Sequence, residues 1–288
     1  MDIGFIGAGV MGRPMAANLV AAGHRLTVHR DTPAARADLG TTVRYAASAA
    51  EATRDCEIVV LMLPDTPDVE EAVCGDDGVL SSLRPGTLVI DMSSISPAAE
   101  RKIATQVAGA GGAYLDAPVS GGEIGARDGT LSIMVGGAPE AVEKARPIFD
   151  VLGSRTSHIG PVGAGQVAKI ANQIVVGLTI EAVAEALHLA EASGVDPLAV
   201  HSALMGGFAS SRVLEVHGHR MIKGQFDPGF RIRLHHKDLR LAAEAADQLG
   251  VSLPGMNLVH VLLDRAVRAG LGDHDHSALR LLRNERAD

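Results

Sequence analysis

The sequence predicts an α/β fold in which a doubly wound, mostly parallel sheet is followed by an all-helical domain. Short β-branched runs alternate with helical stretches through the first half of the 288 residues, a pattern typical of βαβ units. The run "IVVLML" at 58–63 is apolar at every position, as expected for a strand that helices cover on both faces. After "SHIGPVG" the chain reads almost entirely as helix. We therefore expect two domains, 1–162 and 163–288.

Apolar runs and turn residues assign the elements of the first domain in order. Helices are expected over 11–23 and 33–40, and again before the fourth, fifth and sixth strands. A glycine-rich turn, rather than a helix, is expected before the seventh strand. The expected strands are 3–9, 24–30, 42–48, 56–64, 86–94, 113–122 and 131–137.

Composition narrows the class of protein. The formal net charge is -8, only 2% of residues are aromatic and there is no tryptophan, so nucleic acid is not an expected partner. No apolar run approaches the length that spans a bilayer, and the first strand leaves no room for a signal peptide before it. Cys56 and Cys74 have no metal-ligand or disulfide spacing. We expect a cytoplasmic protein with no membrane contact.

The segment "FIGAGVMG" has G-x-G-x-x-G spacing between an expected strand and an expected helix. Gly7 would allow the tight turn, Gly9 the approach of a pyrophosphate to the backbone, and Gly12 the close packing of helix on strand. Free N–H groups at the helix start would face the anion. An ordinary βα turn is the alternative. In this context the motif predicts a Rossmann-type dinucleotide site, formed by Gly7, Ala8, Gly9, Val10, Met11 and Gly12.

The residue that ends the second strand normally contacts the cofactor ribose. An acid there accepts the 2′-hydroxyl of NAD, whereas an arginine accommodates the 2′-phosphate of NADP. The segment "TVHRDTP" places Arg30 where the acid is expected and Asp31 directly after it. Both residues are expected near the cofactor, and Arg30 favours NADP over NAD. The alternative for Asp31 is a solvated charged turn.

Ligands of open α/β sheets bind beyond the carboxyl ends of the strands. Leu63 and Pro64 follow one such strand and Ser94 another, so these three residues are expected to contact the nicotinamide half of the cofactor. Ser93 or Ser94 could instead cap the helix that begins near Pro97.

The segment "DAPVSGG" ends a further strand. Backbone N–H groups of Ser120, Gly121 and Gly122 have no bulky side chains in front of them, and such groups can form a nest for an anion. We expect them to bind a substrate carboxylate. A plain loop is the alternative.

The segment "GAGQVAKIANQ" opens a long apolar helix and places a lysine between amides. Gln166, Lys169, Asn172 and Gln173 share one face at helical spacing. The stripe starts at the expected domain boundary, where a cleft is expected, so Lys169 could act as a general acid toward a carbonyl oxygen. Desolvation would have to bring its pKa down from about 10.4. The apolar neighbours Val167, Ile170, Ala171 and Ile174 are expected to be buried.

Other polar residues carry weaker signals. The histidine pairs His235-His236 and His274/His276 lack a dependable zinc spacing, so no metal site is expected. Lys237 and Asp238 begin a helix and could form a surface ion pair of little energetic value. Arg212, in "ASSRVLE", is a candidate for a second contact to a substrate anion.

Five segments in order, "FIGAGVMGRPMAANLVAAGH", "DAPVSGG", "GTLSIMVGG", "GAGQVAKIANQ" and "HHKDLRLA", resemble the signature segments of the β-hydroxyacid dehydrogenases. The resemblance covers nearly the whole chain. It implies a Rossmann-type domain joined by a long helix to a helical domain, in homodimers or homotetramers. It also implies Lys169 as the catalytic acid/base, Asn172 as its substrate-side partner, Ser120-Gly121-Gly122 on the substrate carboxylate, and Ser94 and Lys237 on the cofactor.

Within that family "GGFASSRVLE", "FDPGFRIRLHHKDL" and "GLGDHDHSAL" most resemble tartronate semialdehyde (2-hydroxy-3-oxopropionate) reductases. The resemblance implies NADP- or NAD-dependent reduction of a small semialdehyde to a hydroxy acid. Alternatives are a 3-hydroxyisobutyrate dehydrogenase or another short-chain semialdehyde reductase, an imine reductase, or a cofactor-binding scaffold without catalysis. Imine reductases of this architecture usually replace the lysine, and Lys169 and Asn172 argue against a scaffold. Arg30 departs from the many members that carry an acid there.

Overall fold

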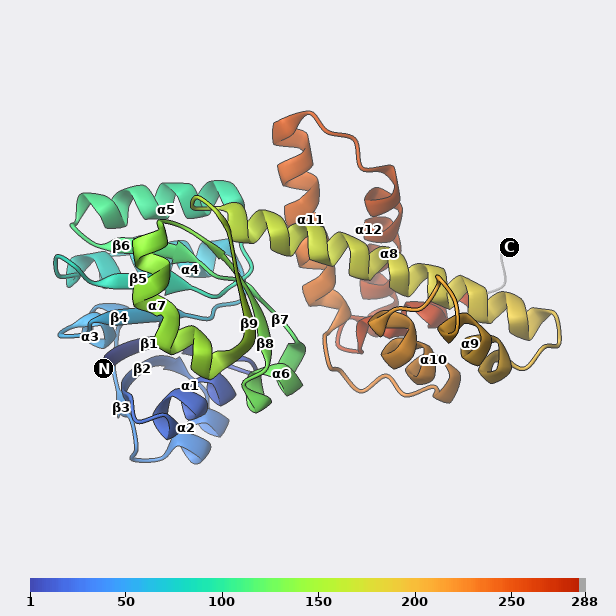
Figure 1. Cartoon of the computed structure of the whole chain (residues 1–288), viewed down its shortest axis with the longest axis horizontal. Helices are drawn as coiled ribbons and strands as arrows, with labels where there is room; N and C mark the ends of the chain where they lie inside the picture. The colour runs from blue at the N-terminus through green and yellow to red at the C-terminus, as the bar shows by residue number, and fades with distance from the viewer. Residues whose placement is uncertain (285–288) are drawn as a thin grey trace. The chain divides into compact units, whose positions relative to one another are not determined.

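The computed structural model of the chain describes residues 1–284 (Figure 1). Two compact units divide it, one from Met1 to Lys169 and one from Ile170 onward. The long helix α8 (Ala164–Ala192) begins in the first unit and continues into the second. Each unit has its own hydrophobic core, so each is described by itself.

The first unit is built on a nine-stranded sheet in the order β3-β2-β1-β4-β5-β6-β8-β7, with β9 paired to β8. Strands β1 to β6 run parallel, whereas β8 is antiparallel to β6 and β7. The prediction of a mostly parallel sheet is therefore confirmed. The strands are β1 Asp2–Ala8, β2 Arg25–Asp31, β3 Arg44–Tyr45, β4 Ile58–Leu61, β5 Leu88–Asp91, β6 Ala113–Asp116, β7 Val119–Ser120, β8 Leu131–Gly136 and β9 Gly153–Gly160.

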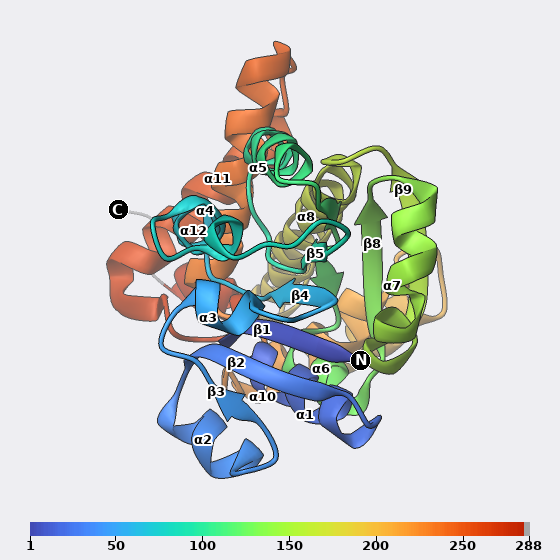
Figure 2. The same ribbon diagram turned by 90° about the vertical axis from the view of Figure 1, so that its left-hand side faces the viewer.

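Helices cover both faces of this sheet (Figures 1 and 2). Successive side chains of a strand point to opposite faces, so Phe5 enters the core beneath α1, α2 and α7 while Ile6 enters the core beneath α3, α4 and α5. Both residues are fully buried. The helical elements are α1 Gly12–Ala21, α2 Pro33–Leu39, α3 Ala49–Thr53, α4 Thr66–Cys74, the 3₁₀ turn η1 Val79–Ser81, α5 Pro97–Gly109, α6 Gly122–Asp128 and α7 Pro139–Leu152.

Three local predictions in this unit are wrong or incomplete. The strand expected over 113–122 is split into β6 and β7, because Pro118 cannot donate a ladder hydrogen bond. The segment expected to be a glycine-rich turn forms the helix α6 instead, and Gly129 is its C-cap residue with a φ of 65°. Its buried Ala126 packs into the core, so tertiary packing outweighs the low helix propensity of its glycines. Strand β9 had no sequence signal of its own.

The secondary structure of the second unit is helical in its described residues, as predicted, apart from one isolated bridge between Arg231 and Asp275. Helices end at Ala192, Lys223 and Leu249, where the turn segments "ASGVDP", "GQFDPGF" and "QLGVSLPG" lie. The elements that follow α8 are α9 Pro197–Met205, the π-turn η2 Leu214–Gly218, α10 His219–Lys223, α11 Ile232–Leu249, α12 Pro254–Ala266, the π-turn η3 Val267–Leu271 and the 3₁₀ segment η4 His276–Asn284.

Helix α8 corrects one expectation about membranes. Within residues 1–284 it is the one helix whose length and composition would suffice to cross a bilayer, although no run of that length was expected. Part of its apolar window, 39%, is buried inside the protein. Core helices of soluble proteins have the same composition, so this feature alone does not indicate a membrane span.

Candidate active site

The glycine-rich loop joins the end of β1 to the start of α1. Gly7 has a φ of +103°, and a Cβ there would lie 2.3 Å from the carbonyl oxygen of Met62. A Cβ on Gly12 would lie 2.0 Å from the carbonyl oxygen of Gly7. A Cβ on Gly9 would meet nothing within 4 Å. The fold itself thus requires Gly7 and Gly12, whereas Gly9 leaves open space that fits the approach of a cofactor phosphate.

Arg30 and Asp31 end β2 beside this loop, where Asp31 is the register partner of Ala8. Arg30 has a φ of 54°, and its guanidinium pairs with Asp68, at 3.2 Å, and with Glu71. The Asp31 side chain is only 13% exposed and pairs with Arg36. Asp31 is therefore not part of a solvated turn. Arg30 stands at the position expected for cofactor selection, with two carboxylates already beside it.

The loops after β4 and β5 are tied to each other. The N–H of Leu63 donates to the Oγ of Ser93 at 2.8 Å, and Ser93 N–H donates to Asp91 Oδ1 at 2.9 Å. The structure thus brings Leu63-Pro64 next to Ser93-Ser94. Helix α5 begins at Pro97, as expected, but its N-cap is Ser96. Neither Ser93 nor Ser94 is the cap, so the capping alternative is wrong.

The segment Ser120-Gly121-Gly122 connects β7 to α6. Gly121 and Gly122 have φ values of 141° and 62°, conformations that L side chains rarely adopt. Asn18 of α1 donates through Nδ2 to the carbonyl oxygen of Ala126 at 2.9 Å. This bond fastens α6 to the helix that follows the glycine-rich loop.

A buried polar network holds the first turn of α8 against the sheet. The Asp116 carboxylate accepts from the N–H of Gly163 at 2.7 Å and from the N–H of Gln166 at 2.9 Å. The Gln166 side chain donates through Nε2 to the carbonyl oxygen of Ser93 at 2.8 Å and to Glu100 Oε1 at 2.6 Å. Gln166 is therefore a structural link between α8 and the strand ends, and this link fixes where Lys169 lies one turn later.

Burial shifts the acids of this network toward their neutral forms. Burial raises the pKa of Asp91 to about 6, although hydrogen bonds from Ser93 act in the opposite direction and lower it. Burial, followed by the charges of Asp91 and Asp116, raises the pKa of Glu100 well above its usual range. Tyr114 donates to Glu100 at 2.6 Å. The sequence offered no signal for Glu100 because its partners Tyr114 and Gln166 lie 14 and 66 positions away in the chain. It offered none for Asp91 because the burial of that carboxyl is decided by tertiary packing.

Two of the four apolar neighbours on α8 that were expected to be buried are exposed. Gln166, Lys169 and Gln173 are 1%, 7% and 4% exposed, whereas Val167 is 54% exposed and Ala171 is also exposed. Polar side chains are buried here because they find partners inside the protein. Of the four apolar neighbours, Ile170 and Ile174 are partly buried.

Asn172, Gln173, Lys237 and Asp238 form a second network within the other unit. Asn172 Nδ2 donates to Gln173 Oε1 at 2.8 Å, and Gln173 Nε2 donates to Asp238 Oδ2 at 2.6 Å. Lys237 Nζ lies 3.0 Å from Asp238 Oδ1, with the two side chains 14% and 5% exposed. The interpretation of this pair as a surface ion pair is wrong. Arg212, by contrast, is an 80% exposed side chain paired with Glu215 at 2.7 Å.

Two family models together cover nearly all of the chain. The NAD binding domain of 6-phosphogluconate dehydrogenase matches residues 2–160, and the NAD-binding domain of NADP-dependent 3-hydroxyisobutyrate dehydrogenase matches residues 163–282. The chain belongs to the β-hydroxyacid dehydrogenase family. It is an NAD(P)-dependent oxidoreductase that transfers hydride between the nicotinamide cofactor and a small hydroxy acid or semialdehyde.

Similar proteins cover this dehydrogenase from end to end. It is 50% identical to 2-hydroxy-3-oxopropionate reductase of Escherichia coli strain K12, over 97% of this chain and 96% of that one. Mycobacterium tuberculosis 3-hydroxyisobutyrate dehydrogenase, solved with L-serine, superposes with a TM-score of 0.91 at 34% identity and covers 99% of both chains. Psf3, solved in complex with NADP+ and 2-OPP, has a TM-score of 0.88 at 25% identity, over 97% of this chain and 99% of that one.

The dehydrogenase also contains a row of histidines in its second unit. His235 Nε2 lies 3.0 Å from the carbonyl oxygen of Gln173, and His235 Nδ1 lies 3.0 Å from His276 Nδ1. His276 Nε2 lies 3.1 Å from His217 Nε2. His217 Nδ1 is 3.4 Å from Asp275 Oδ1. The clusters noted in the sequence were His235-His236 and His274/His276, and His217 was missed because nothing near it in the sequence marks it.

His217, Asp275 and His276 offer ligand atoms within 4.8 Å of one another, a spacing that a metal ion also needs. Asp275 is already engaged, however. Its Oδ1 accepts from Ser277, and its Oδ2 accepts from the N–H groups of Gly229 and Phe230. Burial would raise the pKa of Asp275, but the hydrogen bond to His217 and the charge of His276 hold it well below its usual range. The lone pairs that a metal would require are used in this hydrogen-bonded arrangement.

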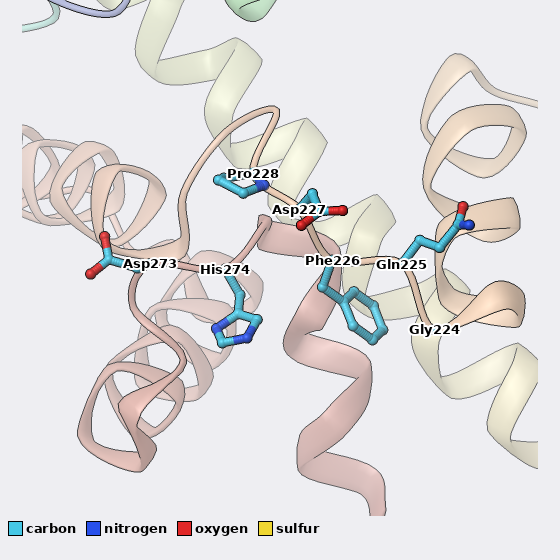
Figure 3. A pocket seen from close by; sticks show the side chains of 7 residues that line it. All are labelled: Gly224, Gln225, Phe226, Asp227, Pro228, Asp273 and His274. Carbon is cyan, nitrogen blue, oxygen red and sulfur yellow. The ribbon is translucent and has the colours of Figure 1, made fainter.

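A pocket of about 420 Å³ lies elsewhere in the second unit, between segments 224–228 and 273–274 (Figure 3). The rings of Phe226 and His274 extend to the same side of these segments. None of the site residues expected from the sequence lines this pocket. The two segments are joined by a hydrogen bond in which the N–H of Asp275 donates to the carbonyl oxygen of Phe226 at 2.9 Å.

Proposed function

We propose that this dehydrogenase reduces 2-hydroxy-3-oxopropionate to glycerate. The 50% identity to the E. coli enzyme of that name supports this substrate. The similarity to the M. tuberculosis enzyme supports the 3-hydroxyisobutyrate reaction, or that of another short-chain semialdehyde, as the alternative. Glycerate and 3-hydroxyisobutyrate are both β-hydroxy acids and differ at one substituent, so the same proton transfer serves both reactions.

The observation that carries the proposal is the burial of Lys169, which is 7% exposed on a helix whose start is anchored by Asp116 and Gln166. Anchoring limits the positions that its ammonium group can take. Bound NAD(P)H supplies a hydride to the aldehyde carbon. Lys169 gives a proton to the carbonyl oxygen, and the product is the alcohol. In the oxidative direction Lys169 takes that proton back.

The other site residues have assigned tasks in this proposal. The glycine-rich loop, Arg30 and Asp31 hold the adenosine half of the cofactor, and NADP is preferred over NAD. Ser120-Gly121-Gly122 bind the substrate carboxylate, and Asn172 is the substrate-side partner of Lys169. Residues 1–162 thereby form the cofactor domain and 163–288 the substrate and oligomerisation domain. The cofactor-contacting residues beyond the loop are Leu63, Pro64, Ser94 and Lys237.

The test is NADPH consumption with tartronate, methylmalonate and succinate semialdehydes. Lys169→Ala should lose at least about 10²-fold in kcat, the lower end of what a positioned proton donor contributes, while it binds NADPH as wild type does. The exposed Lys102→Ala is the matched control and should retain full activity. Turnover by Lys169→Ala within a few-fold of wild type would refute the role of Lys169. Faster turnover of methylmalonate semialdehyde would favour the alternative substrate.

We also propose a homodimer or homotetramer assembled through the second unit. Val175, Leu258 and Val261 are 64%, 58% and 65% exposed, and Leu178 of α8 lies beside the start of α12, since a Cβ on Gly255 would meet it at 3.1 Å. Exposed apolar side chains on these two helices support an interaction site there. Val175→Glu should convert the assembly to monomers in light scattering, and an unchanged mass would count against this surface.

A cytoplasmic location is part of the same proposal. Cys56 and Cys74 are both free thiols in the structure, which is the usual state of cysteines in a reducing compartment. Cell fractionation should recover the dehydrogenase with soluble cytoplasmic markers. Recovery with the membrane fraction would contradict it.

A further inference from the structure

Asn172 and Gln173 of α8 and Asp238 of α11 form a hydrogen-bonded chain with a direction. We propose that Asp238 is a positioning residue that determines, through Gln173, which atom Asn172 presents to the substrate. This inference rests on the proposed function, in which Asn172 is the substrate-side partner of Lys169. It concerns the orientation of that amide, which the role of Asn172 alone leaves undetermined.

The direction of the chain follows from what each group can donate. An ionised carboxylate only accepts hydrogen bonds, so Asp238 Oδ2 requires the NH₂ group of Gln173, at 2.6 Å. The oxygen of Gln173 therefore faces Asn172. Asn172 must then turn its own NH₂ group toward that oxygen, at 2.8 Å. Its Oδ1 is left on the opposite side of the amide as a hydrogen-bond acceptor.

Burial and a second set of contacts hold the chain in place. Gln173 and Asp238 are each 4% exposed, so water does not replace a lost partner at low cost. Asp238 Oδ1 lies 3.0 Å from Lys237 Nζ. The backbone carbonyl oxygen of Gln173 lies 3.0 Å from His235 Nε2. Reversal of the Gln173 amide would place its oxygen against Asp238 Oδ2, and reversal of the Asn172 amide would place its oxygen against Gln173 Oε1. Either change would bring two acceptors together.

The orientation has a consequence for the ligand. An acceptor oxygen on Asn172 matches the hydrogen of the 2-hydroxyl group, which the semialdehyde already carries, and that of the alcohol formed by reduction. It matches neither a carboxylate nor the aldehyde oxygen, because these have no hydrogen to donate. The substrate carboxylate must therefore be bound by other groups, and the Asn172 side of the site selects for a hydroxyl donor.

Asp238→Asn should reverse the donor-to-acceptor direction of this hydrogen-bonded chain. Lys237 can only donate, so it retains the oxygen of the new amide, and the NH₂ group at 238 then faces Gln173. Gln173 must turn its oxygen toward position 238 and its NH₂ group toward Asn172. Asn172 would then accept from Gln173 and present NH₂ to the substrate. We expect kcat/KM for the semialdehyde to fall at least tenfold, with the melting temperature within a few degrees of wild type.

A second substitution distinguishes this mechanism from general damage. In the reversed chain Asn172→Asp supplies an acceptor for Gln173 and a second acceptor for the substrate. In the wild-type chain the same carboxylate would face the oxygen of Gln173. The double variant Asp238→Asn/Asn172→Asp should therefore have at least fivefold higher kcat/KM than Asn172→Asp alone. A double variant that is no more active than Asn172→Asp would overturn the proposal.

The side-chain amide resonances give a readout independent of activity. Selective ¹⁵N-asparagine labelling is practical because the chain has four asparagines, Asn18, Asn172, Asn257 and Asn284. Asp238→Asn should shift the NH₂ signals of Asn172 and leave those of Asn18 in place. Unchanged Asn172 signals would refute the inference even in an active enzyme. If wild type reduces none of the semialdehydes, the proposed function fails, but these signals still decide the orientation.

Discussion

The carboxylate of Asp116 accepts a 2.9 Å hydrogen bond from the backbone N–H of Gln166, 50 positions further along the chain. This contact joins the end of β6 to the first turn of α8. A helix start has N–H groups without partners inside the helix, and a carboxylate there also opposes the helix dipole favourably. One remote acid thus sets the origin of the helix that carries Lys169.

Asp116→Asn should lower the free energy of unfolding by about 1–2 kcal/mol, the usual cost of losing a capping interaction. The amide keeps one acceptor but turns an NH₂ group toward an N–H of the helix. Urea titration measures the effect. Asp128→Asn, at the exposed end of α6, is the control and should stay within about 0.5 kcal/mol of wild type. Equal effects of the two substitutions would show that the cap is unimportant.

Gly9 and Gly12 should respond differently to the same substitution. Gly12→Ala places its Cβ 2.0 Å from the carbonyl oxygen of Gly7, so the loop must shift and the melting temperature should fall. A Cβ at Gly9 meets nothing within 4 Å, so Gly9→Ala should melt near wild type but bind NADPH at least tenfold more weakly. Calorimetry and fluorescence titration measure the two quantities. Normal NADPH affinity in Gly9→Ala would contradict the assignment of the loop.

Asp91 should make stability depend on pH. Its pKa is raised from 3.8 to about 6 by burial, so its stabilising contribution is complete below pH 3.8 and is lost as pH rises through about 6. The difference corresponds to roughly 3 kcal/mol at neutral pH. Asp91→Asn keeps the acceptor for the N–H of Ser93 and cannot ionise. The free energy of unfolding of Asp91→Asn relative to wild type should rise between about pH 4 and pH 6 and change little above that, and parallel curves would disprove the shift.

Arg30 should become a better phosphate ligand when one of its carboxylate partners is removed. Glu71→Gln leaves Asp68 as its remaining ion pair. A freed guanidinium can bind the 2′-phosphate of NADP more strongly. The ratio of kcat/KM for NADPH to that for NADH should rise in Glu71→Gln and fall in Arg30→Gln. Glu70 is an exposed neighbour on α4, and Glu70→Gln should leave this ratio unchanged. If the ratio changes in none of the variants, Arg30 has no part in cofactor selection.

Several features of the fold could be predicted because their causes are local. Apolar runs with short turns predicted the strands, and the spacing of Gly7, Gly9 and Gly12 predicted the turn between β1 and α1. Helix α6 was missed because the signal that decides it, the packing of Ala126, lies in tertiary structure. The partners of the histidines of "HHKD" and "HDHS" could not be predicted, because they lie far away in the chain. His235 contacts His276, and the ring of His236 lies 4.8 Å, centroid to centroid, from the ring of His260.

The sequence by itself determined the α/β sheet, the glycine-rich turn between β1 and α1, the helical second half and the residue types of the candidate site. Periodicity and glycine geometry act over a few residues, so the local pattern contains them. Only the tertiary structure decided that Gln166 and Gln173 are buried while Val167 is exposed. Their partners, Glu100 and Asp238, are 66 and 65 positions away in the chain. A buried amide is stable only where such a partner is present, and no local pattern specifies contacts over that separation.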